Sequence, residues 1–571
     1  MDTEIREAAS EKSETWREVV LRFESACPFR DPVRDCCIVA DFAGTDGMHI
    51  SREAFWDGGA RYCVSFAAPK AGTWTWTLSA PPESGLDGKS GTIEVRPYAG
   101  SLPLFRHGFV RCAQAGELYE GEPLARNMFV HADGTPFFWL GDTHWEFAAG
   151  ESWESSNHPG MASQFRGMAE KRATQGFTVY QTNLRSDFAD HSRFWLTRPD
   201  AEHPIPNPAI FAEEIDRRMH FIAGLGLVNA LGFAWGSSME SGGDAFGAST
   251  SLAEQKTLAR YCVARYGALP LVWTIAGEAS GYNPARHDFL VSAWSEVAKM
   301  VAELDAYHHP VTVHSVNERP FSDAFYDKDW YSFTLNQAGH GDFVVAERDY
   351  REFMAKHAGK PFVEGEALYE GCSSLEENGP RRIDASMLRR VAYMVMQLGG
   401  AGYTYGAQGI WDNVWTKEGL EKSAAGRMLA AVFNRYGVTW AEAIDFPGAE
   451  QMGIMRRFFE EQKWWTLEPY GTGGSALLGR KTPLAAKTED GCHVVAYYAA
   501  TTRRPLEVCG LKDGSWLLRW FDPAEGTYSG EEVRQISGGR MRLPDKPTMD
   551  DWVLVLSRVD SRNLIGKGQK R

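Results

Sequence analysis

The sequence predicts an α/β fold, a central (β/α)₈ TIM barrel flanked by an N-terminal β-sandwich and a C-terminal antiparallel β domain. Short alternating runs with frequent turn signals open the chain, buried apolar runs then alternate with amphipathic stretches, and short β-like runs return at the end. A chain of 571 residues is also too long for one core. We therefore predict a disordered tail at 1–12, the sandwich at 13–100, the barrel at 101–470, a second β-sandwich at 471–560 and a disordered basic tail at 561–571.

The first predicted domain is β-rich because its apolar residues partly alternate with polar ones, which suits strands with one buried face. The expected strands are Trp16–Phe23, Cys37–Phe42, Tyr62–Phe66 and Gly72–Leu78, with a turn at 54–59.

Eight apolar runs in the middle of the chain predict the strands of a barrel with insertions. They are Phe137–Asp142, Phe177–Asn183, Leu227–Trp235, Leu271–Glu278, Val311–Val316, Trp330–Leu335, Pro361–Glu366 and Ala401–Tyr405. Helical periodicity between them predicts helices at Phe211–Gly224 and near 286–306, 345–357 and 383–398. The interval between the fifth and sixth runs is too short for a regular helix. In the last domain, strands are expected at His493–Tyr498, Trp516–Pro523 and Trp552–Leu556.

Composition excludes several classes of partner. The net charge of −15 argues against nucleic acid and anionic membranes, and no apolar run is long enough to span a bilayer. The nine cysteines are scattered without a CxxC pair, and the start lacks the features of a signal peptide. We expect a cytoplasmic protein with free thiols. Homo-oligomerisation through the β domains stays open.

Two of the predicted barrel strands end on a carboxylate. The fourth run ends at Glu278 and the seventh at Glu366, with Glu364 two residues earlier. An unpaired carboxylate is costly in an apolar setting, and the C-terminal ends of barrel strands are where active sites form. Two facing acids suit the cleavage of a glycosidic bond. Glu278 is then the candidate general acid/base and Glu366 the candidate nucleophile. Because Glu364 and Glu366 share a face of a regular strand, alternation alone leaves Glu364 as a rival.

Several further segments resemble the apiosidase-like glycoside hydrolases, glycoside hydrolase family 140 and its relatives. The matching segments are Phe138–Glu146, Gly176–Gln181, Gln337–His340, Gly365–Gly371 and Gly402–Trp411. The flanks are similar to the β-sandwich that often precedes such barrels (14–97) and to a C-terminal domain often labelled as collagen-binding (471–558), from which we infer no collagen binding. The sequence departs from the apiosidase pattern at Glu278, which follows Ala276-Gly277 where that branch has Asp in a Gly-Gly-Asp context. The sugar specificity need not carry over.

The resemblance implies a carbohydrate substrate and favours Glu366 over Glu364 as nucleophile. Acids on strands four and seven resemble the large retaining clan, so we predict a retaining glycoside hydrolase. We expect exo action on a short plant-derived glycoside or oligosaccharide, with an inserted loop at 236–247 closing the pocket. An endo-acting glycanase and a non-catalytic carbohydrate-binding protein are the alternatives.

Polar and aromatic residues near the other strand ends are candidates for substrate binding. They are Asp142, His144, Trp145, Asn183, Trp235, His314, Gln337, His340, Tyr369, Glu370, Tyr405 and Trp411. A helix-capping role for Asp142 is the main structural alternative. We expect no cofactor and no metal, because Asp142 and His144 have no third ligand at a suitable spacing.

Overall fold

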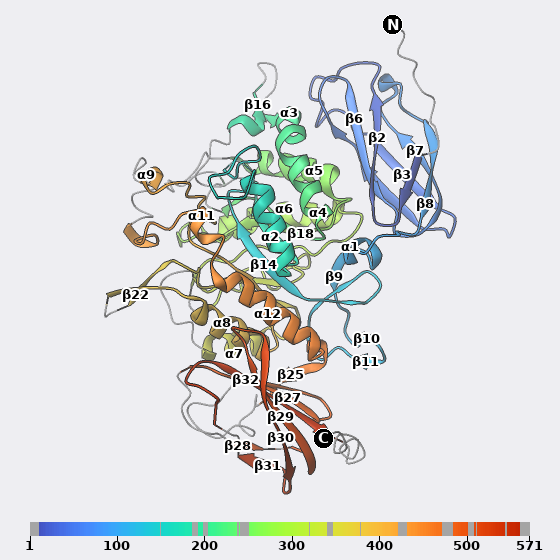
Figure 1. Ribbon diagram of the computed structural model, residues 1–571. Coiled ribbons are helices and arrows are strands. Elements are labelled where there is room, and N and C mark those ends of the chain that lie inside the picture. The colour runs from blue at the N-terminus through green and yellow to red at the C-terminus, as the bar shows by residue number, and fades with distance from the viewer. Residues whose placement is uncertain are drawn as a thin grey trace.

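The computed structural model describes residues 11–148, 150–184, 192–197, 204–236, 239, 250–318, 320–339, 347–376, 379–420, 431–470, 484–500, 507–509, 511–542 and 545–559. Figure 1 shows a β-rich unit at each end of the molecule and an α/β unit between them. The prediction of an α/β protein with additional β domains is therefore confirmed.

The N-terminal unit consists of two facing sheets. The larger has the strand order β1-β8-β7-β3-β4 and the smaller β2-β6-β5. Their bounds are β1 Glu11–Glu14, β2 Glu18–Glu24, β3 Val39–Gly44, β4 His49–Glu53, β5 Phe55–Trp56, β6 Arg61–Ala67, β7 Gly72–Ser79 and β8 Ser90–Arg96. Burial alternates along β7, where Trp74, Trp76 and Leu78 point inward. Across the two sheets Phe42 stacks on Phe66, with ring centroids 3.9 Å apart.

A buried arginine joins this unit to the α/β unit. Arg52 on β4 is 1% exposed, and its guanidinium donates to the carbonyls of Val263 and Ala264. Those carbonyls belong to the last turn of α5 (Leu252–Tyr266), which begins with a capping box formed by Ser251 and Glu254. A cation at the C-terminal end of a helix is favourable, because the last carbonyls lack partners within the helix.

The α/β unit is built on a curled sheet of seven parallel strands, in the order β19-β18-β15-β14-β24-β21-β20. The strands are β14 Trp139–His144, β15 Val179–Asn183, β18 Val228–Trp235, β19 Leu271–Gly277, β20 Thr334–Gln337, β21 Phe362–Glu366 and β24 Gly402–Tyr405. Nearly every residue on them is buried, as expected for parallel strands covered on both faces.

The fifth and sixth predicted strands differ from the structure. The run at 311–316 forms no named strand, although Val311 makes a single parallel bridge to Trp273 of β19 and His314 one to Leu335 of β20. The sixth strand begins at Thr334, four residues later than Trp330. Residues 330–333 are irregular instead, and the Ser332 side chain accepts the amide of Val311.

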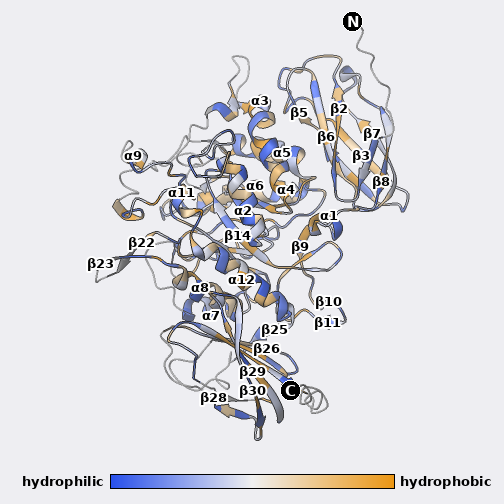
Figure 2. Ribbon diagram, viewed as in Figure 1, coloured by the Kyte–Doolittle hydropathy of each residue, from blue (hydrophilic) through white to orange (hydrophobic). Residues whose placement is uncertain are grey.

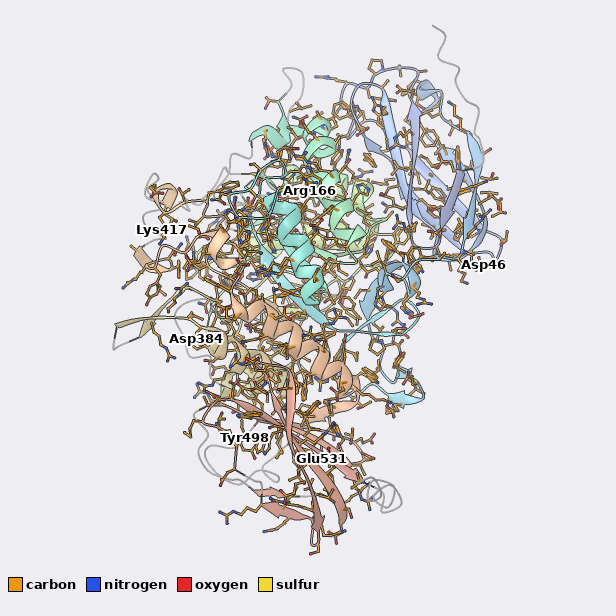
Figure 3. The ribbon with its side chains drawn as sticks, viewed as in Figure 1. Asp46, Arg166, Asp384, Lys417, Tyr498 and Glu531 are labelled. Atoms are coloured by element: carbon orange, nitrogen blue, oxygen red, sulfur yellow. The ribbon has the colours of Figure 1, made fainter. Side chains whose placement is uncertain are left out.

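Helices cover the outside of the sheet. They include α2 Gln164–Gln175, α4 Asp216–Gly224, α6 His287–Leu304, α7 Glu347–Lys356, α8 Ala385–Gln397 and α12 Pro447–Glu461. The predicted helix at 211–224 is present, but its first turn, Phe211–Ile215, is π-helical. Asp384, labelled in Figure 3, caps α8 by accepting the amides of Ser386 and Met387. Figure 2 shows hydrophilic and hydrophobic residues around α12, whose apolar side packs on the unit.

The C-terminal unit has a six-stranded sheet in the order β25-β26-β27-β32-β29-β30 and a small pair, β28-β31. The bounds are β25 Leu467–Pro469, β26 Leu484–Thr488, β27 His493–Tyr498, β28 Glu507–Cys509, β29 Gly514–Asp522, β30 Thr527–Ile536, β31 Arg540–Arg542 and β32 Trp552–Val559. The C-terminal unit contacts the α/β unit through a bidentate ion pair between Arg389 of α8 and Asp551, at 2.8 and 2.6 Å. No helix within the described ranges is both long and apolar enough to cross a membrane.

Candidate active site

Glu278 follows the last residue of β19, at an irregular point of the sheet. The pairing of β18 with β19 shifts register twice near Gly232, and Ile275 has a φ of +45°. Glu278 itself has a φ of +48°. Positive φ is costly for a β-branched residue and uncommon for glutamate, and such backbone is concentrated at functional sites. The irregularity turns the chain so that the Glu278 carboxylate faces β20.

Glu366 is the last residue of β21, and a bulge directs it. Asn336 pairs with Glu364 but Gln337 pairs with Glu366, so Gly365 is an extra residue on β21. A Cβ at Gly365 would lie 2.5 Å from Leu335 Cδ1, so any larger residue would displace the buried Leu335 side chain. Glu366 is 2% exposed, and its Oε2 lies 3.3 Å from His314 Nε2.

The side chain of Gln337 joins the two carboxylates. Its Nε2 donates to Glu366 Oε1 at 2.8 Å and to Glu278 Oε1 at 3.2 Å. Since both oxygens bind one nitrogen, their separation cannot exceed the sum of these lengths, about 6 Å. Glu278 and Glu366 therefore belong to one site, at the C-terminal ends of β19 and β21.

The surroundings of Glu278 favour its protonated form. Burial raises the pKa of this carboxyl, and the negative charge of Glu366 raises it further. Hydrogen bonds from Tyr282 and Gln337 oppose this rise in pKa without cancelling it. A raised pKa widens the pH range over which the carboxyl keeps the proton that a general acid must donate.

Glu364 belongs to a different environment from Glu366. Its carboxylate accepts four hydrogen bonds: from Tyr350 of α7 at 2.7 Å, from the Asn336 amide group at 2.7 Å, and from the backbone amides of Ala338 at 3.1 Å and Glu366 at 3.3 Å. Burial raises its pKa to about 7 although these donors oppose the rise. Glu364 is 0% exposed and all four donors hold it at the strand end, while the choice of Glu366 over Glu364 as nucleophile stays a prediction.

Aromatic rings pack against His314 and Tyr369, the two side chains that adjoin Glu366. Trp145 contacts Trp235 at 5.2 Å and His314 at 5.4 Å between ring centroids, both near edge-on. Trp235 approaches closely because its neighbour is Gly277, where a Cβ would lie 2.2 Å from the Trp235 ring. Tyr369 is 0% exposed, and Trp411 packs against it at 6.0 Å.

Asp142 and His144, both predicted to bind substrate, form a buried ion cluster. Asp142 accepts from Arg172 of α2 and from His144 Nε2 at 2.8 Å, while His144 Nδ1 contacts Glu151 at 2.7 Å. Burial alone would lower the pKa of His144, but Glu151 and Asp142 outweigh it and raise that pKa to about 9. The four side chains are all 0% exposed, which favours a supporting role for the cluster. Their contact with substrate stays a prediction.

Glu370 and Tyr405 also have partners within the protein. Tyr405 donates to Glu370 Oε2 at 2.7 Å, and the same oxygen accepts the amide of Gly448 in the first turn of α12 at 3.0 Å. A carboxylate at the N-terminal end of a helix is stabilised there. Burial raises the pKa of Glu370 to about 7, against the effect of these hydrogen bonds.

The remaining predicted site residues are only partly placed. Asn183 ends β15 and is 1% exposed. His340 lies outside the described residues, and so does most of the expected loop at 236–247. Within the described part of the chain, no three His, Cys, Asp or Glu side chains are grouped to hold a metal ion. The metal-free expectation stays a prediction.

Sequence reasoning missed Tyr282, which contacts both Glu278 and Gln337. Its hydroxyl lies 2.8 Å from Glu278 Oε1 and 3.3 Å from Gln337 Oε1, and it accepts the backbone amide of Asn317 at 3.2 Å. The only sequence signal was an aromatic residue four positions after a strand-end acid, in a loop where periodicity says nothing.

Comparisons with known proteins bear on the family and the fold of the chain. The family model described as "Apiosidase-like, catalytic domain" matches residues 124–466, and one for a domain of unknown function, DUF5060, matches residues 12–81. A candidate glycoside hydrolase from Bacteroides vulgatus ATCC 8482 superposes with a TM-score of 0.65 at 17% identity, covering 96% of this chain and 100% of its own. A protein described as a glycoside hydrolase gives a TM-score of 0.60 at 20% identity, and a family 5 glycoside hydrolase from Bacteroides vulgatus ATCC 8482 gives 0.60 at 19%. Both cover 80% of this chain, and 98% and 95% of their own. These likenesses show the fold. No curated protein matches the chain.

Proposed function

The chain belongs to the apiosidase-like family and is a glycosidase, and we propose that it cleaves its glycoside with retention of anomeric configuration. Glu366 is the nucleophile and Glu278 the general acid/base in this proposal. The other predicted site residues line or support the pocket around them.

One observation carries the proposal, the amide of Gln337 that donates to both carboxylates. It limits their nearest oxygens to a separation of about 6 Å. Retaining enzymes place their two carboxyl groups roughly 5–5.5 Å apart, whereas inverting enzymes need roughly 6.5–9.5 Å to admit a water. The upper limit on the Glu278–Glu366 separation supports the retaining geometry.

The proposed reaction has two steps. In the first, a Glu366 oxygen bonds to the anomeric carbon while the glycosidic bond breaks, and the leaving oxygen takes the proton of Glu278. In the second, Glu278 accepts a proton from water, the water oxygen bonds to the anomeric carbon, and the ester to Glu366 breaks. The donor from Gln337 holds Glu366 in place throughout, and the raised pKa of Glu278 lets it alternate between acid and base.

We further propose that the segment at 311–316 acts as the eighth strand of a closed barrel. Its bridges to β19 and β20, the two edges of the seven-stranded sheet, support this closure. It also brings His314 to Glu366. The exo preference for a short glycoside rests on the expected loop at 236–247, and the products released from an oligosaccharide test it. Single terminal sugars support exo action, and mixed internal fragments indicate an endo-acting enzyme.

A screen of aryl glycosides and plant oligosaccharides supplies a substrate for the main test. Glu366→Ala should abolish turnover, and a 2-deoxy-2-fluoro analogue of the substrate should label Glu366 in the unmodified enzyme, as read by peptide mass spectrometry. The surface change Glu303→Gln on α6, whose side chain is 63% exposed, is the matched control. Label on Glu364, or an inverted first product in NMR spectra, would refute the assignment.

A further inference from the structure

A tyrosine outside the predicted site has the closest contact with the acid carboxyl. Tyr282 is 58% exposed, yet its hydroxyl is held by Glu278, Gln337 and the amide of Asn317. An exposed aromatic ring with a fully bonded hydroxyl is fixed at one end and open to solvent on the other.

A tight turn brings the tyrosine back to the acid. The amide of Gly281 donates to the Glu278 carbonyl at 2.9 Å, and Gly281 has a φ of +66°. A Cβ there would lie 2.6 Å from Leu290 of α6, so the turn packs directly on that helix. The chain thus reverses within four residues, and Tyr282 reaches the side chain of Glu278 from its own loop.

Both donors at Glu278 converge on one oxygen. Tyr282 and Gln337 each reach Oε1, and none of the described residues donates to Oε2. An oxygen that already accepts two hydrogen bonds is the poorer place for a proton. The catalytic proton is therefore directed to Oε2.

The phenol has a second acceptor when Glu278 changes its charge. Its single proton can point to Glu278 Oε1 or to Gln337 Oε1, at 2.8 and 3.3 Å. The charged carboxylate is the stronger acceptor while Glu278 is ionised. Once Glu278 is protonated, the phenol can turn toward Gln337 without losing a partner.

We propose that Tyr282 is a positioning residue that directs the acid proton to Glu278 Oε2, and that its exposed ring forms the wall of the leaving-group subsite. The inference rests on the proposed role of Glu278. A general acid lies beside the departing group, so a ring fixed to the acid faces that group. Flat aromatic faces suit the apolar faces of sugar or phenolic rings.

Among the described residues, the side chains that interact with Glu278 come from four segments. They are Tyr282 on its own loop, Gln337 on β20, Glu366 on β21 and His314 on the segment at 311–316. Only Tyr282 among them is exposed, so its hydroxyl can be removed with little disturbance of the core.

Tyr282→Phe tests the hydroxyl. The loss of a donor to the ionised acid should move the basic limb of the profile of kcat/KM against pH upward, by roughly half to one unit. We expect kcat/KM to fall roughly tenfold for glycosides with poor leaving groups. For the glycosyl fluoride of the same sugar it should stay near the original value, because fluoride departs with little help from an acid. Tyr528→Phe is the matched control, because that hydroxyl also contacts a glutamate and a glutamine, Glu461 and Gln462, but lies on β30.

Tyr282→Leu tests the ring. Compared with Tyr282→Phe, it should raise KM further for leaving groups that contain a ring and leave the glycosyl fluoride unchanged. An unmoved basic limb in Tyr282→Phe, or an equal loss on every substrate, overturns the positioning role. Identical kinetics of the Phe and Leu variants overturn the subsite.

Glu278→Ala is measured alongside to separate the two claims. If Glu278→Ala loses activity on substrates with poor leaving groups while Tyr282→Phe matches the unmodified enzyme, only the inference about Tyr282 fails. If Glu278→Ala hydrolyses every substrate at the original rate, the proposed function fails first.

Discussion

Replacing Gln337 by methionine should raise the pH at which the acid loses its proton. Methionine has a similar length and no donor, so the change removes the amide that serves both Glu278 and Glu366. A hydrogen bond to a charged group contributes up to about 3 kcal/mol, and the ionised form of Glu278 loses this stabilisation when the amide is removed. That energy corresponds to about 2 pKa units, and solvent at the partly exposed Glu278 reduces it to about 1 unit.

The assay is kcat/KM for an aryl glycoside from pH 4 to 10 (~0.5-unit steps), where the basic limb reports the acid in the free enzyme. In Gln337→Met this limb should rise by about 1 unit. The optimum kcat/KM should fall about 100-fold, because a hydrogen bond to a charged group contributes about 1.5–3 kcal/mol. Gln462→Met is the control, since Gln462 is 6% exposed and donates to Tyr528 instead. A basic limb that stays in place in a folded Gln337→Met enzyme would refute the reasoning.

Three other predictions follow from the contacts. Glu364→Gln should keep measurable turnover where Glu366→Gln has none, and equal losses in both would return Glu364 to candidacy as the nucleophile. Because the folded pKa of His144 is about 9, above its ordinary value, its charge stabilises the fold fully below about pH 6.5, and this contribution of about 3 kcal/mol is lost as pH rises through 9. The free energy of unfolding measured in urea should therefore fall as the pH rises over that range. A His144→Gln variant whose unfolding free energy falls equally steeply with pH would contradict the calculation. Arg389→Met should cost about 3–5 kcal/mol of unfolding free energy by leaving Asp551 buried without its ion partner, and adding Asp551→Leu should restore part of it; no recovery in denaturant melts would argue against the pair.

Apolar runs were sufficient to predict most of the parallel sheet. Strands covered on both faces need no alternation, so β15, β18, β19 and β21 begin or end within a residue or two of the predicted runs. The run at 311–316 is equally apolar, yet it makes only single bridges to its neighbours. Hydropathy reports burial but not backbone pairing, and the late start of β20 has the same cause.

The choice between Glu364 and Glu366 shows where period-two reasoning ends. A regular strand would direct both side chains to one face. The bulge at Gly365 separates them: Glu364 turns to Tyr350 on α7, and Glu366 turns to Gln337. Glycine at that position was visible in the sequence, but whether it marks a bulge depends on how close Leu335 lies, which only the packed sheet determines.

Irregular backbone therefore selects the reacting groups in both halves of the site. Glu278 is directed by positive φ at Ile275 and at itself, and Glu366 by an inserted glycine. Each irregularity interrupts a strand that is otherwise buried and regular, so the surrounding sheet holds a conformation that the local sequence disfavours. The carboxyl ends of β19 and β21 then converge on one amide, Gln337. The same logic explains why Tyr282 escaped notice, because a turn of four residues after a strand has no periodicity to read, and only the folded loop shows that its hydroxyl returns to the acid.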